Sequence, residues 1–237
     1  MERSISVVIP VYNEEKNIKN VYINLIKALK LTKIKNYELL FVEDGSKDNS
    51  LKIIQNLKKK NKKKIKIIDN KINRGLGYSI KKGMLLAKKK YIFFLPSDNE
   101  HRHYGIMPML KDFNNFDIII PYVLNKNARP IHRRIISIIY LVFINFLFNH
   151  SLPYFNGLVV YRSKILKPCL KRINNFSFSF LAEVLLRVLR KTKKYKIIGY
   201  KINYNKNSNS SALKLKNVYF SILFILILRL DFWFKQN

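Results

Sequence analysis

The stretch of sequence that decides the fold is Tyr91-Ile92-Phe93-Phe94-Leu95-Pro96-Ser97-Asp98-Asn99-Glu100. It opens with an uninterrupted apolar run, which is typical of a strand buried on both faces, as in parallel sheets. Ligands of open α/β sheets bind beyond the carboxyl ends of the strands, where Asp98 and Glu100 stand. Two carboxylates at such a place suit Mg²⁺ or Mn²⁺. The alternative is an acidic turn that merely stays hydrated.

Composition is that of a folded domain. With 237 residues, 48% of them apolar, the chain is long enough for one α/β domain and too apolar for disorder. The longest apolar segments, residues 135–148 and 218–228, fall short of the roughly 20 residues of a spanning helix and suit core or interfacial helices. Met1-Glu2-Arg3-Ser4 lacks a signal-peptide pattern, so we expect a cytoplasmic location. The single Cys169 excludes an internal disulfide.

The charge is strongly basic, with 46 Lys and Arg against 14 Asp and Glu, a net charge of +32. Such an excess suits anionic lipid, nucleic acid or a phosphorylated substrate, although codon bias in an AT-rich genome would also produce it. The acids are more informative, because half of them cluster in three short segments that each follow a predicted strand: Glu14, Glu15, Glu43, Asp44, Asp48, Asp98 and Glu100. This clustering predicts one shared site.

Strands and helices alternate through the first 95 or so residues. Strands are predicted at residues 4–11, 37–42, 65–69 and 91–95. A helical apolar stripe begins at Ile18 with Asn13 as its cap, and a Gly-containing loop, Asn73 to Gly77, precedes a helix at 78–88. This alternation predicts a mostly parallel sheet with helices on both faces. Right-handed crossovers would bring the three acidic loops to one edge.

Four motifs then point to a family: Ser6-Val7-Val8-Ile9-Pro10-Val11-Tyr12-Asn13-Glu14, Val42-Glu43-Asp44-Gly45-Ser46-Lys47-Asp48, Asn73-Arg74-Gly75-Leu76-Gly77 and Phe94-Leu95-Pro96-Ser97-Asp98-Asn99-Glu100-His101. In order and spacing they resemble the motifs of the inverting GT-A fold glycosyltransferases of family 2. The resemblance is strongest to the dolichyl-phosphate mannose synthases and polyprenyl-phosphate glycosyltransferases. It implies a nucleotide-diphosphate sugar donor, a divalent metal cofactor and the substrate-binding residues Pro10, Tyr12, Glu14, Glu43, Asp44, Arg74, Gly75 and Ser97.

The metal loop departs from the family pattern. The family usually has Asp-x-Asp-x-Gln, whereas here Pro96 stands at the first Asp, Asp98 at the second and Glu100 at the Gln. One carboxylate is lost and another gained, so the resemblance implies a metal site made by Asp98 and Glu100 with altered geometry. Asp98 is also assigned a catalytic role.

The second half resembles the acceptor half of the same enzymes. Arg129, Arg133 and Arg134 precede the apolar segment 135–148, and an Arg pair so placed would hold a donor or acceptor phosphate, with Arg134 catalytic. Ordinary snorkelling of these side chains is the alternative. Asn156 and Gly157 lie at the turn that resembles the family's acceptor segment.

Glu183 has two interpretations. In relatives with a hydroxyl acceptor a carboxylate near this position is the general base, so Glu183 is a catalytic candidate. The alternative is an exposed partner of Arg187, four residues on in the same helix. A polyprenyl phosphate acceptor would need no strong base, because its oxygen is already a competent nucleophile.

The chain is therefore divided into a GT-A domain, residues 1–212, and a C-terminal helix, residues 213–237. The domain comprises a nucleotide-sugar half at 1–121 and an acceptor half at 122–212. The segment 205–211 is polar, and the apolar tail with Trp233 is expected to lie at a membrane interface or to pack on the core or on a second subunit.

We thus expect an enzyme that transfers one sugar from a UDP- or GDP-sugar to a lipid-linked acceptor at the cytoplasmic face of the cell membrane. A hydroxyl of a cell-surface glycan is the alternative acceptor. A non-catalytic basic membrane scaffold or nucleic-acid-binding protein is a further alternative, but no specific nucleic-acid motif is present.

Overall fold

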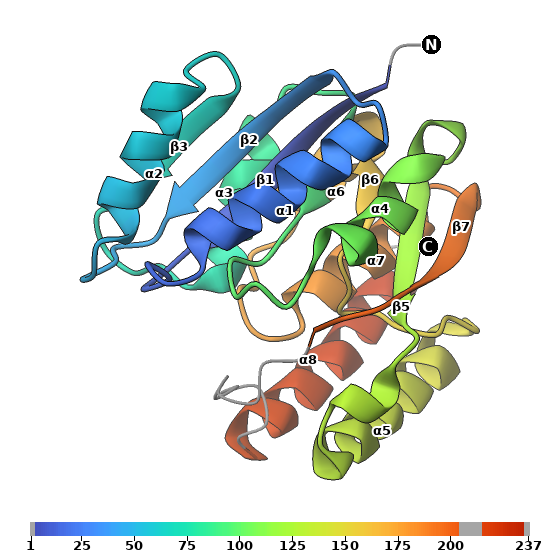
Figure 1. Cartoon of the computed structure of the whole chain (residues 1–237). Helices are drawn as coiled ribbons and strands as arrows, with labels where there is room; N and C mark the ends of the chain where they lie inside the picture. Colours follow the sequence, from blue (N-terminus) through green and yellow to red (C-terminus); the bar gives the residue numbers. More distant parts are fainter. Residues whose placement is uncertain (1–2, 204–214, 235–237) are drawn as a thin grey trace.

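The computed structural model describes residues 3–203 and 215–234. Within these residues a seven-stranded sheet has the order β3-β2-β1-β4-β6-β5-β7 (Figure 1). Only β6 runs antiparallel, against both β4 and β5. The mostly parallel sheet expected from the sequence is confirmed. The strands are β1 Ser4–Val11, β2 Asn36–Glu43, β3 Ile65–Asp69, β4 Tyr91–Phe94, β5 Ile118–Val123, β6 Val160–Arg162 and β7 Tyr195–Tyr200.

Helices cover both faces of the sheet. Helices α1 and α4 pack together on the face toward the viewer in Figure 1, whereas α3 and α6 pack together behind the sheet, α3 against β1 and α6 against β6. Helices α5 and α8 contact each other at one end of the molecule. The helices are α1 Ile18–Leu31, α2 Ser50–Lys60, α3 Leu76–Leu86, α4 His103–Lys111, α5 Ile131–Phe148, α6 Ser163–Lys171, α7 Phe180–Leu189 and α8 Leu215–Phe234, with short 3-10 turns at Phe113–Asn115 and Lys126–Ala128.

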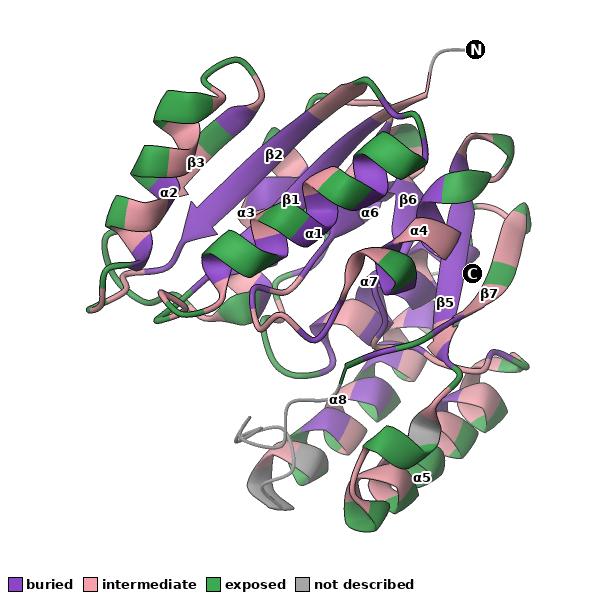
Figure 2. Ribbon diagram, viewed as in Figure 1, coloured by how far each residue is buried: buried purple, intermediate pink, exposed green. Residues whose placement is uncertain are grey.

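The core follows the apolar runs of the sequence. All four residues of β4 are buried, as are the last six of β2 and the last seven of β1 (Figure 2). On α1 the buried stripe includes Ile18, Val21 and Leu25. The double burial predicted for the strand after residue 90 is therefore confirmed.

Two local expectations were wrong. Asn13 does not cap α1, because the helix begins only at Ile18 and Asn13 lies in a left-handed turn with φ 54°. Its Oδ1 instead accepts a hydrogen bond from Lys47 N at 2.8 Å. Helix α5 is also longer than expected: it begins at Ile131, and its 18 residues are long and apolar enough to cross a membrane by length and composition alone. The polar segment 205–211 lies outside the described residues.

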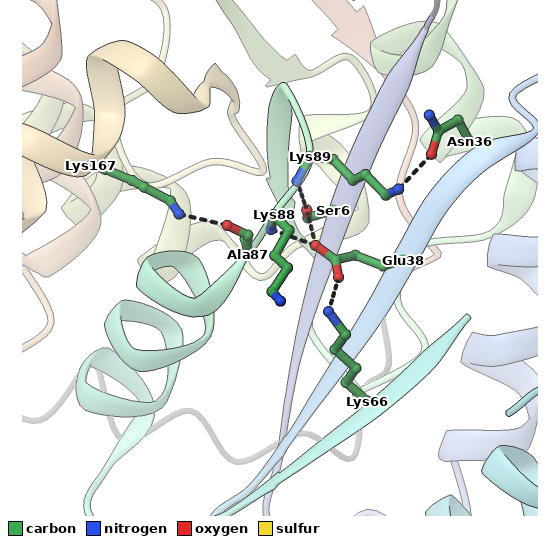
Figure 3. A network of polar contacts seen from close by, with 8 residues as sticks. All are labelled: Ser6, Asn36, Glu38, Lys66, Ala87, Lys88, Lys89 and Lys167. Atoms are coloured by element: carbon green, nitrogen blue, oxygen red, sulfur yellow. Dashed lines mark hydrogen bonds and ion pairs between the residues drawn. The ribbon is translucent and has the colours of Figure 1, made fainter. Parts of the chain in front are cut away.

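A buried carboxylate stabilises the amino-terminal edge of the sheet. Glu38 accepts hydrogen bonds from Ser6 Oγ at 2.7 Å, Lys66 Nζ at 2.6 Å and Lys88 N at 2.5 Å (Figure 3). Lys89 N donates in turn to Ser6 Oγ, so that the chain entering β4 is joined to β1 and β2. Burial alone would raise the pKa of Glu38, but these hydrogen bonds outweigh it and the pKa lies below its ordinary value.

We expect Glu38→Gln to lower the free energy of unfolding by about 1–3 kcal/mol at pH 7, because one donor loses its acceptor. Since the folded-state pKa of Glu38 is depressed, its contribution is present above the unfolded pKa of about 4.3 and is lost as the pH falls through the folded value. The difference between wild type and variant should therefore narrow below pH 4 in urea titrations. Asp112→Asn, which removes an exposed ion pair with Lys196, is the matched control and should change stability by less than about 0.5 kcal/mol.

Candidate functional site

The three acidic loops meet at the carboxyl edge of the sheet. The register pairs Val11 of β1 with Glu43 of β2, and β4 runs parallel on the other side of β1, so all three strands end toward the same edge. Ser97 Oγ donates to the carbonyl oxygen of Pro10 at 2.8 Å, which joins the loop after β4 to the end of β1. The structure thus brings Pro10 and Ser97 together as a buried structural contact, while Tyr12 beside them is 43% exposed.

Glu43 and Asp44 are both buried and hold loops. Glu43 accepts hydrogen bonds from the main-chain N–H of Gly45 at 3.0 Å and Ser46 at 2.6 Å. Asp44 Oδ1 accepts from Arg74 N at 3.0 Å, and its Oδ2 accepts from Gly75 N at 2.9 Å. In the structure, the two carboxylates that the sequence predicted to contact the nucleotide therefore accept hydrogen bonds from the main chain of these loops.

The second and third motifs touch through a glycine. Gly45 has φ +74°, and a Cβ there would lie 2.7 Å from Asn73 N, so only glycine allows this close approach. Gly75 also has a positive φ, +89°, at the start of α3. The guanidinium of Arg74 lies 6.0 Å from the ring centroid of Tyr78. Arg74 is exposed at this edge, where a phosphate could reach it.

The acidic loop, defined here as residues 96–101, turns sharply at Asn99, which has φ 61°. Glu100 N donates to Asp98 Oδ1 at 3.0 Å, so the turn holds one carboxylate oxygen of Asp98 in place. Burial raises the pKa of Asp98. Burial also raises the pKa of Glu14, and the nearby Asp98 and Asp48 add to this effect. The first and last acidic loops are thus electrostatically coupled.

The donor set of the acidic loop fits a divalent metal in part. Asp98 and Glu100 offer the hard oxygen atoms that Mg²⁺ and Mn²⁺ prefer. Among residues 3–203 and 215–234, however, no group of three His, Cys, Asp or Glu side chains is placed to hold an ion. An ion here would need oxygen atoms from water or from a bound diphosphate to complete its coordination.

Arg129 is the site residue that sequence reasoning did not select. It precedes α5, it forms a side-chain hydrogen bond with Tyr154, and its charge acts on Asp98, Glu100 and His101. The signal in the sequence was only the grouping of Arg129 with Arg133 and Arg134. Those two half-buried side chains begin α5.

The acceptor-side candidates lie between β5 and α5. Gly157 is buried, and a Cβ there would lie 3.1 Å from Tyr154 Cδ1 and 3.2 Å from the carbonyl oxygen of Pro121. Asn156 Oδ1 and the hydroxyl of Tyr140 on α5 are both buried. Burial raises the pKa of Tyr140, and the side chain of Asn156 opposes that shift from close by. These two polar groups therefore lie close to each other on the acceptor side.

Glu183 is a buried ion-pair partner on α7. Its side chain is 2% exposed, and its Oε1 accepts a hydrogen bond from Arg187 Nε at 2.7 Å. Arg187 Nη2 also lies 3.3 Å from Asp231 Oδ2 on α8. The pairing with Arg187, expected as the alternative, is present. The exposure expected for Glu183 was wrong, because α7 packs with this face inward. Burial raises the pKa of Glu183, whereas Arg187 opposes that shift.

Comparison with known proteins identifies the family. The model described as glycosyl transferase family 2 matches residues 6–176. This chain belongs to that family. It is 30% identical over 128 residues to a dolichyl-phosphate beta-glucosyltransferase of Dictyostelium discoideum, which covers 52% of this chain and 37% of that protein. It is 27% identical over 189 residues to the dolichol-phosphate mannosyltransferase of Saccharomyces cerevisiae, covering 77% and 70% of the two chains.

The fold of this family 2 glycosyltransferase is the GT-A fold. Its structure resembles that of Mycobacterium tuberculosis glucosyl-3-phosphoglycerate synthase in complex with Mn²⁺, UDP-glucose and phosphoglyceric acid, with a TM-score of 0.66 and 13% identity. This match covers 97% of our chain and 79% of the other. The chain spans about half or less of the length of the first curated relatives that it matches.

Asp44→Asn should loosen the loop at Arg74 and Gly75, because an amide nitrogen would replace one of the two oxygen atoms that accept from it. We expect a loss of about 1–3 kcal/mol in unfolding free energy and earlier tryptic cleavage after Arg74, read by mass spectrometry. Asp69→Asn, whose ion pair with Lys71 is largely exposed, is the control. Equal effects of the two variants would contradict this account of Asp44.

Proposed function

We propose that this glycosyltransferase moves a sugar from a UDP- or GDP-sugar to a polyprenyl phosphate at the cytoplasmic membrane surface. The phosphate oxygen of the acceptor forms a bond to the anomeric carbon from one side. The bond to the diphosphate breaks on the other side, and the nucleoside diphosphate leaves with the electron pair. The anomeric configuration is thereby inverted.

The observation that carries this proposal is the placement of an exposed apolar helix at the same edge of the sheet as the acidic loops. Helix α5 follows the carboxyl end of β5, and of its described side chains only Ile144 is buried (Figure 2). Ile139, Val142 and Phe146 are 60%, 61% and 83% exposed. A lipid-linked acceptor could thus present its phosphate to the site while its chain stays in the bilayer.

In this proposal the loops of residues 1–121 bind the donor. Pro10, Tyr12 and Glu14 would line the nucleotide pocket, with Glu43 and Asp44 shaping its walls and Arg74 near the phosphates. A divalent ion held by Asp98, Glu100 and the diphosphate would neutralise charge on the leaving group. On the acceptor side, Arg133 and Arg134 belong to α5, and Asn156 and Gly157 follow α5 in the chain. We assign residues 1–121 to donor binding and residues 122–212 to acceptor binding. A single sheet contains strands of both halves.

The state of Glu183 favours a phosphate acceptor over a hydroxyl. A general base must accept a proton from the acceptor, and its carboxylate must therefore reach the substrate. Here Arg187 already occupies the carboxylate of Glu183, which is almost fully buried. A phosphate acceptor needs no such base, so Glu183 can serve as a structural ion-pair partner that joins α7 to α8 through Arg187.

The test is transfer of labelled sugar from a panel of UDP- and GDP-sugars to polyprenyl phosphate in vesicles, with Mn²⁺ or Mg²⁺. We expect one donor to yield a labelled, mild-acid-labile lipid. Glu183→Gln should reduce the rate no more than its matched control Arg187→Gln, which breaks the same ion pair and leaves the carboxylate. A loss of roughly 10²–10⁴-fold in Glu183→Gln alone would identify a general base and a hydroxyl acceptor. Transfer from no donor to any acceptor would contradict the enzymatic proposal.

The exposed face of α5 should bind anionic bilayers. The double variant Ile139→Asp and Phe146→Asp replaces two exposed apolar side chains of α5. It should lower the partition coefficient onto phosphatidylglycerol vesicles by roughly tenfold or more, because burial of one such side chain contributes about 1.5–3 kcal/mol of free energy. Cosedimentation measures the effect. The control is Ile23→Asp with Leu31→Asp, which changes two exposed apolar residues of α1. Equal losses in both double variants would show that α5 is not the contact surface.

A further inference from the structure

The turn between β5 and α5 is fixed beside the acidic loop. Asn125 Nδ2 donates to the carbonyl oxygen of Ile202 at 2.8 Å, and Ile202 N donates back to Asn125 Oδ1 at 3.0 Å. The next residue, Asn203, donates its N–H to the carbonyl oxygen of Glu100 at 2.8 Å. Two successive residues after β7 thus join the turn that ends at Arg129 to the acidic loop.

Arg129 is half-buried in a polar cluster. Its guanidinium donates a hydrogen bond to the hydroxyl of Tyr154 and lies near Tyr200 and Glu100. The guanidinium of Arg129 is a cation throughout the physiological pH range, as arginine side chains in proteins are. Tyr200 is buried and its ring centroid is 5.7 Å from that of His101, which closes the cluster on one side.

His101 lies beside this cluster, with its ring packed near that of Tyr200. Its Nδ1 is buried and has no hydrogen-bond partner among the described residues. The guanidinium of Arg129 therefore stands near the two carboxylates that would hold a metal.

The charges have a direct consequence for ligand binding. Asp98 and Glu100 provide two negative charges, and Arg129 offsets one of them. That weakens attraction for a divalent cation, which already lacks a third protein ligand among the described residues. The same guanidinium, with several N–H donors in a fixed plane, matches the oxygen atoms of a phosphate group.

We propose that Arg129 binds the diphosphate of the donor and makes nucleoside diphosphate binding largely independent of a divalent metal. This inference rests on the proposed function, since it requires a nucleotide donor. Tyr154 is a positioning residue that orients the guanidinium. The divalent ion remains an accessory ligand that binds together with the diphosphate.

Calorimetric titration of the whole chain with UDP and with GDP, in Mn²⁺ and again in EDTA, tests the proposal. In the wild type we expect EDTA to weaken binding of the preferred nucleotide by less than about threefold. Arg129→Gln should weaken nucleotide binding by about 10- to 100-fold in EDTA, and the binding that remains should depend strongly on Mn²⁺. Arg129→Lys keeps the positive charge and should lose less nucleotide affinity than Arg129→Gln. Lys62→Gln removes one charge from an exposed turn at the opposite edge of the sheet, and it should leave nucleotide affinity and its Mn²⁺ dependence unchanged.

Tyr154→Phe is a second probe with a smaller structural change, and we expect it to weaken nucleotide binding in EDTA by a few fold. Loss of wild-type binding in EDTA, or unchanged metal dependence in folded Arg129→Gln, would overturn the inference and leave the proposed function standing. If neither nucleotide binds the wild type under any condition, the proposed function fails with it. Thermal unfolding of each variant shows whether it is folded.

Discussion

The arrangement of the site depends on main-chain N–H groups that hold its carboxylates. Parallel pairing of β1 with β2 and β4 forces three acidic loops together, which would be costly if their charges had no partners. Glu43 accepts from two N–H groups of its own turn, and Asp44 accepts from two in the next motif. Asp48 accepts from Ser50 N and Glu15 N. Backbone N–H groups therefore supply these hydrogen bonds to Glu43, Asp44 and Asp48.

Local pattern predicted the strands well and the contacts between distant segments poorly. The apolar runs of β1 and β4 can be recognised in the sequence because a strand buried on both faces needs no partner to define its pattern. The role of Asn13 depends on Lys47, and that of Arg129 depends on residues after β7. The inward face of Glu183 likewise reflects how α7 packs. Apolar periodicity contains none of this information, since each case is decided by contacts between segments far apart in the chain.

The C-terminal helix is part of the fold as well as a surface. Ile225, Leu228 and Phe232 of α8 are buried, and the ring of Phe232 packs 5.5 Å from that of Phe148 on α5. The buried pairing of Arg187 with both Glu183 and Asp231 adds a polar contact between α7 and α8. Leu226 and Trp233, on the same helix, are 40% and 60% exposed. Helix α8 thus holds α5 against the domain while both helices keep apolar side chains outside.

The net charge of +32 and the exposed apolar side chains of α5 would contribute separately to membrane binding. The lysine run at residues 58–64 lies where α2 ends and β3 begins, at the amino-terminal edge of the sheet. The eight residues of β2 separate that edge from the acidic loops by roughly 26 Å. Electrostatic attraction is screened within about 8 Å at physiological ionic strength. Those lysines would therefore contribute little to the proposed contact between α5 and a bilayer, and the charges of Arg133 and Arg134 on α5 would contribute more than the net charge.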